Sequence, residues 1–129
     1  MAVIQTRDTR TFIAGENLAS AQFHFVTLEA DGQVDLADAA GETCIGVCLV
    51  GGAAGAAVTV ALSGKVMVEA GDAITAGDAI ATNAAGEAVN LATAGAAATT
   101  TMGYALEDGV DGQIIAIELI QGGNVSDQS

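Results

Sequence analysis

The sequence predicts an all-β fold, a compact β-barrel or sandwich built from two weakly repeated β units with an extended N-terminal arm. Three observations predict it. Short apolar runs alternate at period two, which is typical of strands with one buried face. The chain holds 17 glycines and no proline, a balance that suits tight turns between short strands. Aromatic residues make up only 3% of the chain, so the core must come from Val, Ile, Leu and Ala.

The first expected element is the arm, residues 1–12, which is rich in threonine and shows no helical period. A single β domain is expected over residues 13–121, and a polar tail over residues 122–129. Turn signals such as Asp31-Gly32, Ser63-Gly64 and Asp111-Gly112 divide the domain. The alanine-rich segment 92–98 is open to a short helix or a loop. The expected strands are residues 22–28, 33–36, 44–49, 57–63, 65–69, 79–82, 87–91, 102–106 and 113–119.

A weak duplication links the two halves of the domain, with pseudo-repeats at about residues 14–64 and 70–121. Residues 14–18 (AGENL) recur as residues 70–74 (AGDAI), and residues 45–49 (IGVCL) recur as residues 102–106 (MGYAL). An alternating strand follows each glycine of the second pair at the same spacing, over residues 58–62 and 115–119. Because neither half could bury its apolar face alone, the two units are expected to pack as one body.

The net charge of the chain limits the classes of partner that it is expected to bind. Its 3 basic and 16 acidic residues give a net charge of −13. Phosphate binding needs clustered Lys and Arg, so a nucleic-acid partner is not expected, and neither is an anionic membrane surface. No run of 18 apolar residues and no secretory leader are apparent. The acidity favours solubility, or docking on a surface with basic patches.

No catalytic, cofactor or metal site is expected. Cys44 and Cys48 would lie roughly 13 Å apart along a strand, too far to bridge each other, and they are interpreted as small core residues in a reducing compartment. His24 is the single histidine, and it alternates away from its two phenylalanine neighbours toward solvent or an interface. Segment 108–112 (DGVDG) lacks the length and the closing glutamate of a calcium loop.

One partial resemblance concerns carrier domains. Val68, Gly71-Asp72 and Gly77-Asp78 look like the strands that lead to the modified lysine of biotinyl and lipoyl carriers. Residues 83–86, at the hairpin position, contain no lysine, and Lys65 precedes the segment. A carrier or small ligand-binding barrel therefore stays only as an alternative.

A second resemblance covers residues 12–120. Its motifs are short and based on glycine and alanine: residues 23–26 (FHFV), 31–34 (DGQV), 45–47 (IGV), 58–60 (VTV), 64–66 (GKV), 70–71 (AG), 77–78 (GD), 103–106 (GYAL) and 112–115 (GQII). In their order, these residues resemble the small phage capsid cement, or decoration, proteins.

The resemblance implies a non-enzymatic virion protein that is made in the host cytoplasm and binds the outside of an expanded icosahedral head. It implies the major capsid protein and further copies of the chain as partners, with homotrimers at threefold positions. A head-fibre or receptor-binding virion protein is the alternative. Because the arm holds two of the three basic residues, the hypothesis for capsid contact is Thr6, Arg7, Asp8, Arg10 and Phe12.

Overall fold

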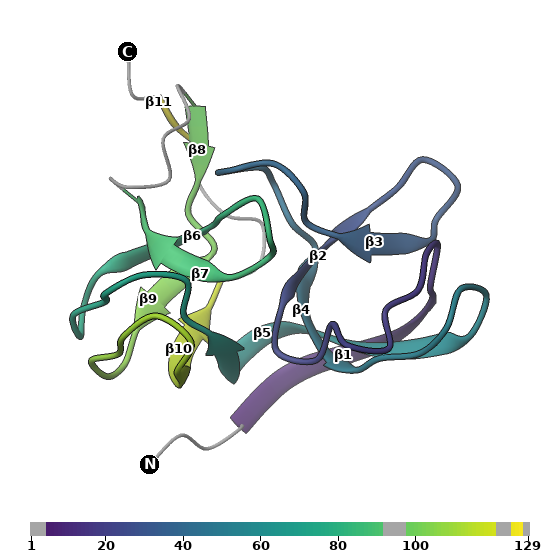
Figure 1. The fold of residues 1–129 in the computed structure, drawn as a ribbon, viewed down its shortest axis with the longest axis horizontal. Coiled ribbons are helices and arrows are strands. Elements are labelled where there is room, and N and C mark those ends of the chain that lie inside the picture. The colour runs from purple at the N-terminus through teal and green to yellow at the C-terminus, as the bar shows by residue number, and fades with distance from the viewer. Residues whose placement is uncertain (1–4, 92–97, 121–124, 128–129) are drawn as a thin grey trace.

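The computed structural model describes residues 5–91, 98–120 and 125–127. The elements with defined bounds there are all β-strands, which confirms the predicted all-β class. Figure 1 shows a curled sheet with its strands gathered on either side of β5. No helix in these residues is long and apolar enough to cross a membrane. The strands are β1 (Gln5–Ile13), β2 (Phe25–Leu28), β3 (Val34–Leu36), β4 (Gly46–Val50), β5 (Ala57–Glu69), β6 (Ala79–Thr82), β7 (Ala88–Asn90), β8 (Ala98–Thr100), β9 (Gly103–Ala105), β10 (Ile114–Leu119) and β11 (Val125–Asp127).

β5 organises the main sheet, which has nine strands in the order β3-β2-β4-β5-β10-β9-β6-β7, with β1 also paired to β5. Residues 59–61 of β5 pair with both β1 and β4, so these two strands lie on opposite edges of β5. Gly64 and Lys65 pair with both β1 and β10. β4 and β10 therefore lie one after the other along the same edge of β5. β8 and β11 form a separate pair.

The predicted turn at Ser63-Gly64 is wrong, because β5 runs without a break from Ala57 to Glu69. Gly64 has a φ of 101°, and the register with β1 is irregular where Thr6 faces Gly64 and Asp8 faces Ser63. The pairing skips Arg7 on β1 and Leu62 on β5, which is the pattern of a bulge. Gly64 lies beside it with the positive φ that a tight turn would also use. A glycine with positive φ is common in both tight turns and bulges, so the sequence does not distinguish between them.

The start of the first domain strand also differs from the prediction. Residues 22–24 form a turn and the strand begins at Phe25. Phe23 has a φ of 66°, which is rare for a residue with a side chain and is incompatible with a continuous strand. The reversal takes His24 out of the strand. The predicted segment 92–98 lies outside the described residues except for Ala98, which begins β8.

The two halves of the sheet pair in corresponding registers. β1 to β4 and the first half of β5 form one set, the first unit; the second half of β5 with β6, β7, β9 and β10 forms the other, the second unit. Matched pairs are Val26↔Gly46 with Ile80↔Gly103, Cys48↔Val60 with Ala105↔Ile117, and Phe12↔Val58 with Val68↔Ile115. In this correspondence, β1 matches the second half of β5. The agreement supports the proposal that the chain is a duplicated β unit that shares its longest strand.

Each unit has its own core, and the two cores lie on opposite faces of β5. Val58, Val60 and Leu62 belong to the core of the first unit, whereas Val66 and Val68 belong to that of the second. In a regular strand, all five side chains would point the same way. The pairing with β1 skips Leu62, so β5 has one extra residue here, and the alternation reverses between Leu62 and Val66. One strand therefore serves both cores.

Candidate interaction surfaces

The five predicted contact residues all fall within β1. This strand pairs antiparallel with β5 of the same chain, and no other strand in the described residues pairs with it. The side chains of Thr6, Arg7 and Asp8 lie outside the described part of the structure. One edge of β1 is therefore open, and an open edge can accept a strand from a partner.

Arg10 and Phe12 differ in exposure although they share a face of β1. Phe12 packs partly against the core of the first unit, and it faces Val58 across the strand pair. Arg10 faces Val60 and is exposed. Because side chains two positions apart point the same way, Arg10 lies at the rim of the face that Phe12 helps to close. It is the one of the two whose side chain is accessible to a partner.

A second surface lies on the outer side of the second unit, and we call Tyr104, Ile114 and Glu118 its open face. Tyr104 faces Glu118 across β9 and β10, and Ile114 shares the face of Glu118 by strand alternation. Tyr104 is 44% exposed and Ile114 is 36% exposed. An exposed tyrosine is typical of a protein contact, and a charged side chain such as Glu118 is typical of the polar rim around one.

In the first unit, the residues that correspond to Tyr104 and Glu118 are buried. Val47 matches Tyr104 and Ala61 matches Glu118, yet both Val47 and Ala61 are fully buried. They join the core of the second unit. The sequence analysis did not identify the open face. An alignment of the two repeats could have indicated it, because Tyr104 and Glu118 align with apolar residues of the first repeat.

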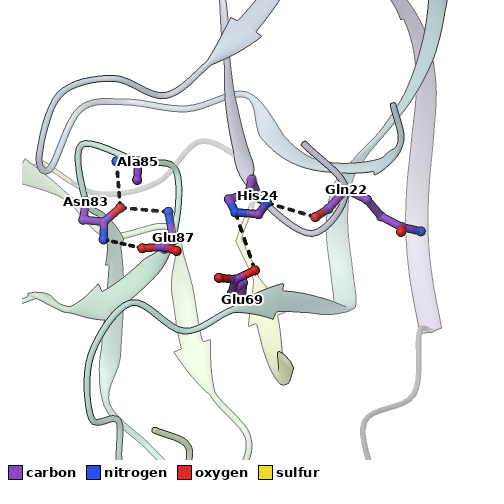
Figure 2. Close-up of polar contacts among 6 residues, drawn as sticks. All are labelled: Gln22, His24, Glu69, Asn83, Ala85 and Glu87. Atoms are coloured by element: carbon purple, nitrogen blue, oxygen red, sulfur yellow. Dashed lines mark hydrogen bonds and ion pairs between the residues drawn. The ribbon is translucent and has the colours of Figure 1, made fainter. Parts of the chain in front are cut away.

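A polar cluster lies where the two units meet, and we call His24, Glu69 and Glu87 the junction cluster. His24 Nε2 lies 3.7 Å from Glu69 Oε1, and one potential ligand atom from each of the three residues lies within 4.8 Å of the others. Figure 2 shows the imidazole pointing toward Glu69, with Glu87 on the neighbouring loop. The cluster thus gathers residues from the turn before β2, the end of β5 and the turn before β7.

Backbone and amide groups outside the cluster orient its members. His24 Nδ1 donates to the carbonyl oxygen of Gln22 at 2.9 Å. The side-chain amide of Asn83 donates to Glu87 Oε1 at 3.1 Å, while its oxygen accepts from the backbone N–H groups of Ala85 and Glu87, each at 2.9 Å. These contacts are drawn in Figure 2. The turn that carries Glu87 is therefore built around Asn83.

The electrostatics of the cluster are dominated by carboxylates. Burial raises the pKa of Glu69 first, followed by a hydrogen bond to Glu87 and the negative charges of Glu87 and Asp111, while His24 opposes the rise. The side chains of His24 and Glu69 are 16% and 30% exposed. A partly desolvated group of this composition favours a bound proton or cation.

The backbones of the two units also bond to each other at this junction. Phe25 N donates to Gly86 O at 2.7 Å, Glu69 N donates to Phe23 O at 2.8 Å, and Gly41 N donates to Thr82 O at 2.8 Å. A hollow of about 160 Å³ lies beside them and is lined by residues that include Glu16, Ser20 and His24. The junction is thus a packed interface beside a partly polar hollow.

The two cysteines are placed in the cores rather than in a site. Cys44 is buried with the second core and Cys48 with the first. Burial, with a smaller effect from Glu42, raises the pKa of Cys44 to about 12, and burial also raises the pKa of Cys48. Thiols with raised pKa values are poor nucleophiles at neutral pH.

Comparison with known proteins gives a family and a fold. A family model described as phage cement protein matches residues 4–119. Among solved structures, "The crystal structure of head fiber gp8.5 N base in bacteriophage phi29" matches with a TM-score of 0.68 and 21% sequence identity, over 91% of this chain and 97% of that one. No curated protein matches the chain.

Proposed function

Because the chain belongs to the phage cement protein family, we propose that it binds the outer surface of an icosahedral phage head and stabilises contacts between major capsid protein subunits. The observation that carries the proposal is the family match, which spans both β units. The role is structural and needs no catalytic residue. We place the protein on the virion surface, after assembly in the host cytoplasm, as trimers at threefold positions.

The open edge of β1 is the proposed capsid contact, through Thr6, Arg7, Asp8, Arg10 and Phe12. Strand addition at an unpaired edge supplies backbone hydrogen bonds without demanding a particular partner sequence. Arg10 adds a positive charge at that edge of a chain whose net charge is −13. Repeated over many equivalent sites on a shell, weak contacts of this kind produce strong overall stabilisation.

The test uses capsids made without this protein. Purified chain is mixed with expanded heads, bound and free protein are separated on a density gradient, and the decorated heads are heated until they release DNA. Binding at a fixed ratio to the major capsid protein, together with a higher release temperature, is the expected result. Binding without a change in release temperature would contradict the stabilising role, and absence of binding would contradict the whole proposal.

A charge reversal tests the contact surface separately. Arg10→Glu should weaken head binding at least tenfold, since it replaces attraction by repulsion at the rim of β1. Lys65→Glu is the matched control, because it makes the same charge change on β5. Equal losses in both variants would show that net charge, rather than the edge of β1, governs binding.

The solved head-fibre base favours a second candidate function. Its fold covers most of this chain, so the chain could serve as the base through which a fibre is attached to a head. Electron microscopy of decorated heads distinguishes the two roles. A low, even layer of density with a raised DNA-release temperature supports cement, whereas isolated projections with an unchanged temperature support a fibre base.

A further inference from the structure

We propose that the junction cluster of His24, Glu69 and Glu87 is a binding site for a divalent transition-metal cation such as Zn²⁺. The sequence did not predict it, because a lone histidine without a Cys or His partner nearby carries no metal spacing. The fold assembles the ligands from three separate segments. The inference is independent of capsid binding and concerns the isolated chain.

The ligand atoms are close enough to converge on one ion. All three lie within 4.8 Å of one another, and His24 Nε2 and Glu69 Oε1 are 3.7 Å apart. Ligands bound at about 2.0–2.1 Å in a tetrahedral zinc site are separated by roughly 3.4 Å. The two glutamate side chains are only half-buried, so a bound ion would require them to rotate by a small amount.

The imidazole is already oriented as a ligand. A carbonyl oxygen can only accept, so the contact of Nδ1 with Gln22 O places the proton on Nδ1. Nε2 points toward Glu69 Oε1 at 3.7 Å, and in the neutral form of the ring it is the nitrogen that can bind a metal. Metal-binding histidines commonly donate their other ring N–H to a backbone carbonyl in this way, which holds the tautomer and the ring orientation. Gln22 lies outside the cluster, so this contact is separate from the carboxylates.

The local charge requires compensation. A carboxylate oxygen of Glu69 and one of Glu87 lie within 4.8 Å of each other and of a ring nitrogen of His24. Two carboxylates this close repel each other, and a cation bound between them would relieve the repulsion. One imidazole nitrogen and two carboxylate oxygens form a mixed donor set, and the imidazole favours Zn²⁺ over Mg²⁺ and Ca²⁺, which prefer oxygen alone.

An ion in this place would connect the two units. His24 belongs to the first unit and Glu87 to the second, while Glu69 ends the strand that both share. The units already meet here through the bond from Phe25 N to Gly86 O. A bound metal would therefore hold the junction closed, and the free energy of binding would add to the stability of the whole chain.

The experiment uses the full chain, stripped of metal with EDTA and dialysed, in thermal unfolding and titration calorimetry. Zn²⁺ at a hundredfold excess over its Kd should raise Tm by roughly 8 °C, with one site per chain, whereas Mg²⁺ and Ca²⁺ should have little effect. Co²⁺ should give a visible spectrum without a thiolate charge-transfer band, which excludes Cys44 and Cys48 as ligands.

Variants locate the site. Glu87→Gln keeps the shape of the side chain, and it should lose at least tenfold in Zn²⁺ affinity and most of the Tm shift. His24→Asn should do the same, while circular dichroism confirms that both variants are folded. Glu118→Gln, the same substitution on the open face, should bind as the unmodified chain does. Absence of a Zn²⁺ shift in the unmodified chain, or an equal shift in Glu87→Gln and Glu118→Gln, would overturn the proposal.

Discussion

Gly46 and Gly103 occupy corresponding positions in the two units, and both lack a side chain for the same reason. A Cβ on Gly46 would overlap the carbonyl oxygen of Ala61, and one on Gly103 would overlap that of Glu118. In each case the obstacle is the backbone of the neighbouring strand, which has no alternative rotamer. The strand pairs β4–β5 and β9–β10 can therefore approach only where the residue is glycine.

Alanine at either position should be costly. We expect Gly46→Ala and Gly103→Ala each to reduce the free energy of unfolding by about 2–3 kcal/mol, measured by urea denaturation. Gly55→Ala is the control, because Gly55 has open space around it and only its φ of 85° is unfavourable for alanine. Its expected cost is about 1 kcal/mol. Similar losses at all three positions would mean that backbone conformation, not the close approach, is responsible.

The pKa of Cys44, raised to about 12 by burial, predicts an inert thiol. Ellman's reagent should modify neither cysteine of the folded chain at pH 8, and both should react once the chain is unfolded in guanidinium. Rapid labelling of a chain that remains folded by circular dichroism would contradict this. Comparison with a Cys44→Ala variant shows which of the two cysteines is responsible for any labelling.

The same shift has a consequence for alkaline stability. The pKa of the thiol is higher in the folded state than its ordinary value of 9.0, so the folded chain holds this proton more tightly than the unfolded chain does. The stabilising effect is complete below pH 9 and is lost as the pH rises toward 12. Tm should therefore fall across this range, and it should fall less in Cys44→Ala.

At the scale of an element, β1 is part of the fold as well as a candidate contact. It pairs along β5 from Gln5 to Ile13, and Phe12 packs on the first core. The sequence indicated an extended segment but not its partner, since pairing with a strand some fifty positions later is a non-local choice. The boundary between arm and domain stays a prediction.

Removing β1 should therefore destabilise the chain. Deletion of residues 2–12 is expected to lower Tm by more than 10 °C, because it exposes one edge of β5 and one side of the first core. Loss of head binding in this deletion would thus not identify a contact by itself, which is why Arg10→Glu is the sharper variant. An unchanged Tm would show that β1 contributes no stability.

At the scale of the whole molecule, the two units share a strand and core contacts, so we expect them to unfold together. β5 belongs to both, and Phe25, Val47 and Ala61 of the first unit are buried in the core of the second. Breaking either unit exposes apolar surface of the other. The chain should behave as one cooperative body.

Calorimetry measures this cooperativity. We expect one transition, with a van't Hoff enthalpy equal to the calorimetric enthalpy within error. Phe25→Ala, which removes a fully buried ring at the junction, should lower stability by about 3–5 kcal/mol without splitting the transition. Two resolved transitions in the unmodified chain would show that the units are independent domains.

What the sequence determined by itself is the local and periodic part of the structure. Alternation over residues 58–62 and 115–119 identified the two central strands because the pleat of a strand imposes a period of two on any half-buried segment. The repeated motifs around Gly46 and Gly103 matched positions that the structure also matches, and the short motifs indicated the family. Most strand positions followed from such local signals.

Only the tertiary structure decided how these segments meet. The two predicted strands form one continuous strand, and the irregular pairing around Leu62 and Gly64 places their cores on opposite faces. Packing of the units then buries Val47 but leaves Tyr104 exposed, and it brings His24, Glu69 and Glu87 together from distant segments. The alternation along a strand indicates which of its side chains are buried. It does not indicate which other residues they pack against, because those contacts join residues far apart in the chain.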